Sequence, residues 1–327
     1  MENYTEEMYI KAHDNRILLS LMVELLTKCN EKCIHCYIPQ HTSNGVDTER
    51  IKKLIDEFRD LGGLNLSLTG GEIFLRKDLF EIIEYARKNY LRIFLLTNAT
   101  MLDEEIVRRL KCNNIAELSV SVYSLDSDVH DKITGVKGSL DKTLQGLSLA
   151  KKYNIPVTVK TPLMDINKYS YKELKNYCKE NGFKYLASTI IFSKSNGDDS
   201  IKSLSINDND LAKVYKETKD IAPVSKRKLF DEACGSLKYS LAIDASGNVY
   251  PCNSLYYKVG NIYTDSLSDI WNGVTIQNIQ NIKKKDLHIC SKCKVQEKCS
   301  RCPGLALLED GDLYGCSSSA YKVACLY

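Results

Sequence analysis

Apolar positions along the first two thirds of the chain follow two alternating patterns. Short apolar runs are separated by longer stretches in which apolar residues recur every three or four positions. The first pattern is typical of buried strands, and the second is typical of a helix with one buried face. The predicted strands are 21–26, 64–68, 92–96, 117–122, 156–160 and 185–192.

The predicted helices lie between these strands and after the last one. Asp47 can cap a helix that Gly62-Gly63 ends, and Asp103 can cap another. Strands that alternate with helices in this way favour a parallel α/β architecture. The other predicted helices are 79–86, 139–153 and 208–219.

The composition changes near residue 219, where cysteine becomes frequent. Beyond this point, alternating apolar residues around Ser246-Gly247 predict a β-hairpin. We therefore expect three parts in the chain. They are an N-terminal arm over the first strand (1–18), an α/β domain (19–221) and a cysteine-rich domain (222–327).

Composition and charge exclude several classes of function. The chain has 327 residues, enough for about two domains, and its net charge of +3 is spread along its length, which argues against a nucleic-acid-binding surface. The N-terminus lacks the order of a signal peptide, and no apolar run is long enough to span a membrane. Thirteen cysteines without a secretion signal favour metal binding in a reducing compartment, which we expect to be the cytoplasm.

Three cysteines follow the first predicted strand, in the stretch Cys29-Asn-Glu-Lys-Cys33-Ile-His-Cys36-Tyr37. Their spacing lets one short loop hold three thiolates around a single inorganic centre. Since a cubane cluster has four irons, three thiolates leave one iron open to an outside ligand. Two other interpretations are a zinc knuckle completed by His35 and a set of buried thiols.

Polar groups also stand at the ends of the next three predicted strands. The second strand is followed by Thr69-Gly70-Gly71-Glu72, the third by Asn98, and the fourth presents Ser121. Because parallel strands end at one edge of a sheet, these groups and the cysteine loop should share one mouth, where barrel enzymes place their chemistry. Paired glycines can also mark an ordinary turn, Asn98 can be a turn former, and Ser121 can be a buried hydrogen-bonded serine.

The last third of the chain holds a dense pattern of cysteines. Four of them form the run Cys290-x2-Cys293-x5-Cys299-x2-Cys302, which is dense enough to bind metal. Taken alone, this run fits zinc and iron–sulfur clusters equally well, because Cys-x2-Cys pairs are typical of zinc ribbons. Cys112 and Cys178 stand apart on predicted helices, and we expect both to pack in the core.

Together these motifs resemble the radical S-adenosylmethionine enzymes. In that family the open iron of a Cys-x3-Cys-x2-Cys cluster is chelated by the amino and carboxylate groups of S-adenosylmethionine, and a Gly-Gly-Glu motif holds the amino group. The resemblance implies a partial (β/α)6 TIM-like barrel of parallel strands. It also implies six residues that contact the cofactor: Tyr37, Gly70, Gly71, Glu72, Asn98 and Ser121.

The C-terminal pattern resembles the SPASM domain, which carries auxiliary four-iron clusters in this family. The resemblance implies two such clusters, and therefore three four-iron clusters in all. Two features depart from the family: two residues rather than three separate Cys299 from Cys302, and the inner cluster has only three evident thiolates, unless Cys325 reaches it. Cys325 could also replace Cys316 in the outer cluster. The implied ligands are Cys290, Cys293, Cys299 and Cys316 for the outer cluster and Cys234, Cys252 and Cys302 for the inner one.

Relatives with this framework mostly modify peptides, by forming thioether or carbon–carbon crosslinks in ribosomally made precursors. The resemblance therefore implies a peptide maturase that cleaves S-adenosylmethionine reductively, takes a hydrogen atom from its substrate and receives electrons from a flavodoxin or ferredoxin. Asn253 stands where sulfatase maturases have an aspartate, which argues against that activity. Alternatives are a maturase of a small cofactor such as a porphyrin and, from another class, a non-catalytic iron–sulfur carrier or zinc protein.

Delivery of a peptide substrate would need a further partner or a direct binding surface. About twenty residues precede the first predicted strand, whereas a separate leader-binding domain needs roughly fifty. We therefore expect a second protein to deliver the leader, or the peptide to bind the barrel mouth and cluster domain. The motifs single out no nucleophile or general base, since the cofactor supplies the reactive species.

Overall fold

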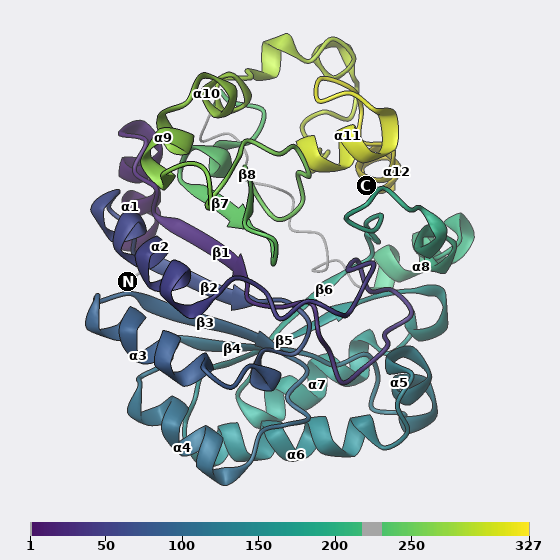
Figure 1. Ribbon diagram of the computed structural model, residues 1–327. Coiled ribbons are helices and arrows are strands. Elements are labelled where there is room, and N and C mark those ends of the chain that lie inside the picture. Colours follow the sequence, from purple (N-terminus) through teal and green to yellow (C-terminus); the bar gives the residue numbers. More distant parts are fainter. Residues whose placement is uncertain (1, 218–230, 327) are drawn as a thin grey trace.

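One open sheet runs through the part of the chain that the computed structural model describes, residues 2–217 and 231–326 (Figure 1). Within these residues the sheet has nine strands, in the order β6-β5-β4-β3-β2-β1-β7-β8-β9. The first six strands are parallel, which confirms the predicted partial barrel. They are β1 (Ser20–Glu24), β2 (Asn65–Thr69), β3 (Arg92–Thr97), β4 (Glu117–Ser121), β5 (Val157–Pro162) and β6 (Lys184–Ser188).

Helices connect the parallel strands and cover the sheet (Figure 1). The predicted caps are present, since Asp47 accepts a hydrogen bond from the Arg50 backbone at 2.9 Å and Asp103 accepts one from the Ile106 backbone at 2.8 Å. No helix of the described residues is both long and apolar enough to cross a membrane. The helices are α1 (Glu2–Asp14), α2 (Thr48–Asp60), α3 (Leu79–Lys88), α4 (Glu104–Cys112), α5 (Ser127–Thr134), α6 (Ser139–Lys152), α7 (Tyr171–Asn181), α8 (Asp208–Glu217), α9 (Leu267–Asn272), α10 (Val274–Gln280), α11 (Pro303–Asp310) and α12 (Ser318–Ala324).

The main core lies between the parallel strands and the helices that connect them. It contains fully buried side chains such as Phe58 on α2 and Leu95 on β3. Cys178 on α7 belongs to this core, as predicted. Cys112 is exposed, so the prediction that it packs inside is wrong. It follows the buried Leu110 by two positions, and residues two apart on a helix face different directions.

The cysteine-rich region extends the same sheet. Strand β7 (Ser240–Ile243) pairs in parallel with β1, and β8 (Asn248–Tyr250) returns antiparallel to β7, which confirms the predicted hairpin. The short strand β9 (Gly260–Asn261) completes the sheet beside β8. The C-terminal region therefore begins next to the strand that leads into the cysteine loop. The predicted domain boundary at residues 221 and 222 lies outside the described residues.

The predicted N-terminal arm contains helix α1, and the end of this segment contacts the C-terminal region. His13 Nε2 lies 3.0 Å from Glu232 Oε2, and Trp271 Nε1 donates to the Arg16 carbonyl at 2.8 Å. The N-terminal segment therefore helps to hold the cysteine-rich region against the barrel. The two contacts join residues 219 and 255 positions apart, so local sequence patterns could not predict them.

Candidate functional site

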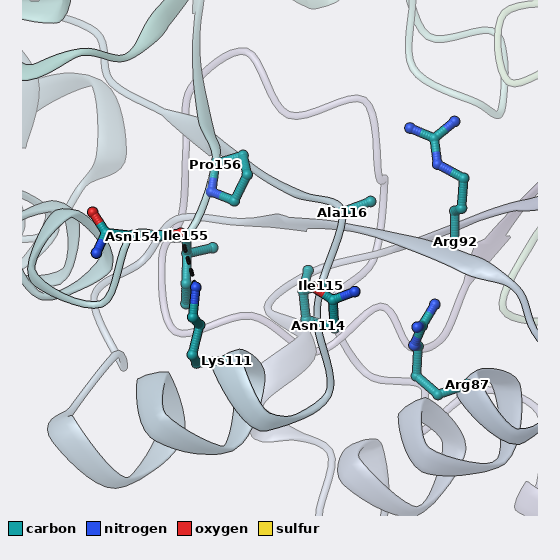
Figure 2. Close-up of a pocket in the computed structure, with 9 residues that line it drawn as sticks. All are labelled: Arg87, Arg92, Lys111, Asn114, Ile115, Ala116, Asn154, Ile155 and Pro156. Atoms are coloured by element: carbon teal, nitrogen blue, oxygen red, sulfur yellow. Dashed lines mark hydrogen bonds between the residues drawn. The ribbon is translucent and has the colours of Figure 1, made fainter.

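Cavities open at both ends of the parallel strands. One of about 310 Å³ lies at the amino ends of β3, β4 and β5 (Figure 2), where Lys111 donates to the Asn154 carbonyl at 3.5 Å. Another of about 390 Å³ lies beside the cysteine loop and is lined in part by Cys33 and Cys36. Barrels of this type carry their chemistry at the carboxyl ends of the strands. We therefore place the candidate site at the cysteine loop and not in the cavity of Figure 2.

The predicted site residues gather at one edge of the sheet. Strands β1 and β2 end level with each other, since Glu24 pairs with Thr69, and β3 and β4 do so too, since Thr97 pairs with Val120. The cysteine loop follows β1, the Gly-Gly-Glu loop follows β2, and Asn98 follows β3. The parallel pairing therefore brings these segments to the same mouth.

The cysteine loop presents three thiols at this mouth. Cys29 Sγ accepts a hydrogen bond from the Glu31 backbone at 3.4 Å, and the Cys36 backbone donates to the Cys33 carbonyl at 3.1 Å. Burial, with a contribution from Cys36, raises the pKa of Cys29 to about 11, and burial also raises the pKa values of Cys33 and Cys36. Because metals bind thiolates, cluster binding must release protons from this loop.

Gly70 and Gly71 let the second loop pass directly against the first. The Gly71 backbone donates to the Leu26 carbonyl, and the Glu72 backbone donates to the Lys28 carbonyl, both at 2.9 Å. A Cβ atom on Gly71 would lie 2.0 Å from the Lys28 oxygen, and Gly70 has a φ of +136°. Only glycine fits such a close approach and such a backbone conformation. The two glycines therefore fix where the cysteine loop begins.

Glu72, which follows β2, is fully buried, and its carboxylate bonds to the end of β3 and to the backbone of the next turn. Its oxygens accept hydrogen bonds from the Thr97 hydroxyl at 2.8 Å, the Asn98 backbone at 2.9 Å and the Phe74 backbone at 3.1 Å. Burial raises the pKa of Glu72, whereas these hydrogen bonds lower it. The carboxylate therefore ties the end of β2 to the end of β3, and its lone pairs are largely engaged inside the protein.

Three further predicted contact residues lie at the same edge. The Asn98 side chain donates to the Asn30 side chain at 2.8 Å and so fastens the cysteine loop to β3. The Tyr37 hydroxyl donates to the Glu24 carboxylate at the end of β1. Ser121 is half-buried at the end of β4. Their contacts with a cofactor stay predictions.

Two buried polar side chains of the cysteine loop were not among the predicted cofactor contacts. Glu31 is 3% exposed, its Oε2 accepts from the Cys33 thiol at 3.5 Å, and its Oε1 has no hydrogen-bond partner among the described residues. His35 packs edge-on against Tyr123 with ring centroids 4.9 Å apart, and its Nδ1 has no hydrogen-bond partner there either. Burial raises the pKa of Glu31 to about 7 and lowers that of His35 to about 4. Unpartnered buried atoms of this kind are rare and need an explanation.

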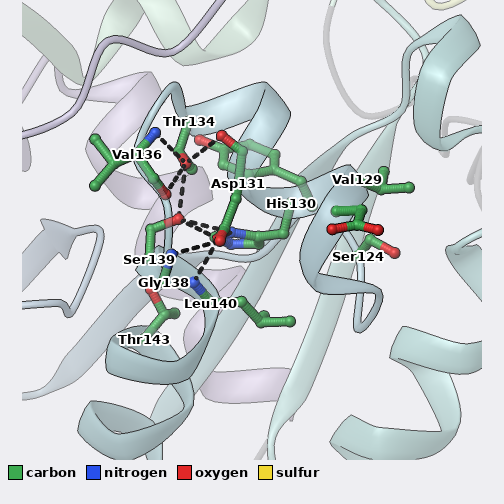
Figure 3. Close-up of polar contacts among 12 residues, drawn as sticks. Ser124, Val129, His130, Asp131, Thr134, Val136, Gly138, Ser139, Leu140 and Thr143 are labelled. Atoms are coloured by element: carbon green, nitrogen blue, oxygen red, sulfur yellow. Dashed lines mark hydrogen bonds and ion pairs between the residues drawn. The ribbon is translucent and has the colours of Figure 1, made fainter.

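Helix α5 supports the cysteine loop from its outer side. The Thr134 carbonyl in its last turn accepts a hydrogen bond from the Lys32 backbone at 2.8 Å. Figure 3 shows the polar network that fixes this helix end: Asp131 accepts from the Ser139 hydroxyl at 2.8 Å and from the Leu140 backbone at 3.0 Å. The sequence patterns did not predict this helix. It completes a frame that holds the cysteine loop from several sides.

The C-terminal cysteines form two groups, and Cys234, Cys252 and Cys302 make up the first, which we call the inner group. Burial raises the pKa of Cys252 to about 12, and the thiols of Cys302 and Cys234 lie close enough to raise it as well. Cys234 and Cys252 also pack against the apolar side chains of Leu237 and Leu255. These three cysteines are the set predicted for the inner cluster.

The outer group contains Cys290, Cys293, Cys299 and Cys316. Burial raises the pKa of Cys316 to about 11, and the other three thiols contribute to this rise. Cys325 lies beside this group. Its thiol is the main cause of the raised pKa of Tyr321, and the thiols of Cys293 and Cys316 raise that pKa further, so all three lie near the same tyrosine. The outer group therefore matches the predicted ligand set, with a fifth thiol next to it.

This grouping accounts for every cysteine of the chain. Three lie in the cysteine loop, three in the inner group, and the outer group takes four with Cys325 beside it, while Cys112 and Cys178 lie in the barrel. Cys325 lies near the outer group, and whether it closes either cluster stays a prediction.

Tyr256 lies between the inner group and the cysteine loop. Its ring packs edge-on against Tyr250 with centroids 5.8 Å apart. Burial is the main cause of its raised pKa, and Glu24, Cys252 and Cys36 all lie close enough to raise it further. The inner group therefore lies on the side of the C-terminal region that faces the barrel mouth.

The residues at the mouth fit an iron–sulfur cluster with one further polar ligand. Three thiols stand on one loop, and the Glu31 carboxylate of the same loop contacts Cys33 through Oε2 and has no hydrogen-bond partner for Oε1 among the described residues. Within residues 2–217 and 231–326, no three His, Cys, Asp or Glu side chains lie close enough together to hold a single metal ion. A cubane cluster held by three thiolates keeps one iron free for a bound molecule.

Models of known families match most of the chain. Residues 23–186 match the radical SAM superfamily, and residues 234–303 match an iron–sulfur cluster-binding domain, the SPASM domain. The first match contains the cysteine loop and the Gly-Gly-Glu loop. The second contains the inner group and three of the four cysteines of the outer group.

Two curated relatives differ in what they make. The AdoMet-dependent heme synthase of Methanosarcina barkeri is 26% identical over 328 residues, which covers 88% of this chain and 92% of the synthase. The antilisterial bacteriocin subtilosin biosynthesis protein AlbA of Bacillus subtilis is 26% identical over 297 residues, which covers 85% of this chain and 66% of AlbA. Relatives therefore include both peptide and porphyrin enzymes.

Solved structures share the fold. Streptococcus suis SuiB bound to S-adenosylmethionine has a TM-score of 0.73 at 16% identity, over 95% of this chain and 79% of that one. SuiB bound to its precursor peptide SuiA has a TM-score of 0.71 at 15% identity, over 97% and 80%. The superfamily match spans about half of this chain and includes its cysteine loop. On that match the chain belongs to the radical SAM superfamily, as a 4Fe-4S-dependent enzyme that uses S-adenosylmethionine and carries a C-terminal SPASM domain for auxiliary iron–sulfur clusters.

Proposed function

We propose that this enzyme modifies a ribosomally made precursor peptide and forms a thioether or carbon–carbon crosslink in it. The observation that carries the proposal is the inner group, in which three thiols leave one iron of a four-iron cluster without a protein thiolate. A cysteine of a peptide can bind at such a position. AlbA is a bacteriocin biosynthesis protein, and one structure of SuiB holds a precursor peptide, which supports a peptide as substrate.

The residues of this chain position the reaction and shield it from water. Bound at the cysteine loop, S-adenosylmethionine with its reduced cluster supplies a 5′-deoxyadenosyl radical that takes a hydrogen atom from the substrate. Glu72 and the two glycines before it fix the loop against β2 and β3. Tyr256 lies near both Cys36 of the cysteine loop and Cys252 of the inner group, which favours the binding of a peptide between them. We expect three four-iron clusters, a flavodoxin or ferredoxin as electron donor, and either a separate leader-binding protein or direct binding of the peptide at the mouth.

A porphyrin is the second candidate substrate. The alignment with the heme synthase covers nearly the whole of both chains, whereas the alignment with AlbA leaves a third of AlbA unmatched. A porphyrin has no thiol, so it cannot place a sulfur on an open iron in the inner group. The two candidates therefore differ in whether a substrate thiol binds the auxiliary cluster.

A spectroscopic experiment separates the two candidates. A candidate cysteine-containing peptide should change the paramagnetic signal of the reduced auxiliary cluster, and the same peptide with serine in place of cysteine should not. Iron-coproporphyrin III should leave the signal unchanged. A change with both peptides, or with neither, would count against the open position. A change on Cys325→Ala without peptide would mean that Cys325 already occupies it, contrary to its place beside the outer group.

Glu72→Ala should weaken S-adenosylmethionine binding at least about tenfold and also lower the melting temperature. Removing the buried carboxylate leaves the Thr97 hydroxyl and the backbone groups of Asn98 and Phe74 without their acceptor, which costs about 1–3 kcal/mol for each unsatisfied group. Equilibrium dialysis and thermal unfolding measure the two effects. Thr97→Val removes one donor only and should show a smaller loss of both. Equal cofactor affinity in wild type and Glu72→Ala would show that this motif is assigned wrongly.

A further inference from the structure

Two buried carboxylates lie at the barrel mouth, Glu31 within the cysteine loop and Glu72 after β2. Their hydrogen bonding differs. Glu72 is fully buried and accepts hydrogen bonds from Thr97 and from two backbone groups. Glu31 is 3% exposed, and its Oε1 has no hydrogen-bond partner among the described residues. A buried carboxylate oxygen without a donor is strongly unfavourable. Glu31 therefore has the unused acceptor at this site.

Glu31 lies where the cysteine loop meets the ends of the strands. Its partnered oxygen, Oε2, lies 3.5 Å from Cys33 Sγ. Glu72 raises the pKa of Glu31, and the Asn98 side-chain amide lowers it as a nearby donor, although that amide forms its 2.8 Å hydrogen bond with Asn30. The carboxylate therefore stands at the junction of the cysteine loop with the ends of β2 and β3. No Lys, Arg or His of the described residues forms an ion pair with Glu31 or Glu72. Among the described residues, Oε1 of Glu31 is therefore an acceptor that a donor from outside the protein can fill.

We propose that Glu31 accepts a hydrogen bond from the amino group of S-adenosylmethionine. The proposal rests on the function proposed above, which places that molecule against the open iron of the cysteine loop. An amino group keeps N–H donors when it binds a metal, and a carboxylate is the strongest acceptor available to it. Glu72, which the sequence motif assigns to this task, then acts as a positioning residue that holds β2 and β3 together.

The test compares three ligands on anaerobically reconstituted enzyme. S-adenosylmethionine and S-adenosylhomocysteine both carry the amino group, whereas 5′-methylthioadenosine lacks it. Glu31→Gln should raise the dissociation constants of the first two about tenfold to hundredfold, the range of a hydrogen bond to a charged group, and leave that of the third unchanged. The KM for S-adenosylmethionine should rise in step, while kcat at saturation changes little, because ground-state binding is what is lost.

Control variants separate this role from damage to the loop. Glu117→Gln changes a glutamate at the opposite end of β4 that pairs with Lys184, and it should leave all three dissociation constants unchanged. Iron content and the visible spectrum show whether Glu31→Gln keeps its cluster. If that variant loses iron, Glu31→Asp, which keeps the charge but shortens the reach, should still weaken the first two ligands selectively.

Each outcome supports or overturns the assignment. Affinity for S-adenosylmethionine within twofold of wild type in an iron-replete Glu31→Gln variant would overturn it. Weaker binding of S-adenosylmethionine alone would show that Glu31 faces the sulfonium and not the amino group, which also overturns it. Equal weakening of all three ligands would show general disorder of the loop in place of a lost contact with the amino group, which overturns it too. Wild-type enzyme that neither binds nor cleaves S-adenosylmethionine would instead contradict the function on which the inference rests.

Discussion

Replacing Cys29, Cys33 and Cys36 together with alanine is expected to remove about one third of the bound iron and all cleavage of S-adenosylmethionine. Wild-type enzyme reconstituted without oxygen should hold about three four-iron clusters, or roughly twelve irons per chain. The three cysteines share one loop that is separate from the inner and outer groups, so the auxiliary clusters should remain. Iron analysis and chromatography of 5′-deoxyadenosine measure the two losses.

A cysteine outside the three groups provides the control for this experiment. Cys112 is exposed at the end of α4, and Cys112→Ala should leave both iron content and cleavage unchanged. Loss of all iron from the triple variant would mean that the clusters do not assemble independently. Stoichiometric zinc with little iron in the wild type would contradict the cluster assignment altogether.

The order of strands and loops at the mouth could be predicted because its signals are local. Each parallel strand starts within one residue of the predicted position, and the cysteine spacing and paired glycines fell on strand ends independently. The sixth strand shows the limit of this approach. It was expected to reach residue 192 but ends at Ser188, and Thr189 bonds instead to the Tyr215 hydroxyl at 2.6 Å. Apolar pattern alone does not reveal where pairing stops.

The roles of individual carboxylates could not be predicted, because they depend on tertiary contacts. The Gly-Gly-Glu motif predicts that Glu72 faces the cofactor, yet in the structure its oxygens bond to the Thr97 hydroxyl and to the backbone groups of Asn98 and Phe74. Glu31 reads in the sequence as an ordinary polar loop residue, and only its burial sets it apart. The sequence around helix α5 holds only weak local signals. They are Asp126, which caps its start, and Gly135, which ends it in the left-handed conformation.

The grouping of the C-terminal cysteines needed information from beyond the local sequence. Cys234 and Cys302 lie far apart in the chain, and spacing alone fitted zinc as well as iron. Resemblance to the family supplied the ligand sets, and the structure brings the same sets together. The superfamily match rules out the alternative of a non-catalytic carrier or zinc protein. Which cluster each set binds stays a prediction.

Gly71→Ala and Gly304→Ala should each disable one cluster region and spare the other. A Cβ atom on Gly71 would lie 2.0 Å from the Lys28 oxygen, and one on Gly304 would lie 1.8 Å from the Ser254 oxygen. These neighbours are backbone atoms, which cannot rotate away, so each variant should lose about 1–3 kcal/mol of stability or more. Gly138→Ala meets no atom within 4 Å but has a φ of +77°, so it controls for backbone strain without a steric clash and should lose less stability than either variant.

The two variants should differ in what they lose, because the two clashes lie on different loops. Gly71→Ala pushes the Gly-Gly-Glu loop away from the cysteine loop, and we expect at least about a hundredfold less 5′-deoxyadenosine, with the auxiliary iron retained. Gly304→Ala separates the segment after Cys302 from the segment after Cys252. It should keep S-adenosylmethionine cleavage but lose the spectral response to a cysteine-containing peptide. If both variants lost both properties in parallel while Gly138→Ala lost neither, the barrel mouth and the inner group would form one cooperative unit, and the peptide thiol could not be assigned to the inner group by these variants.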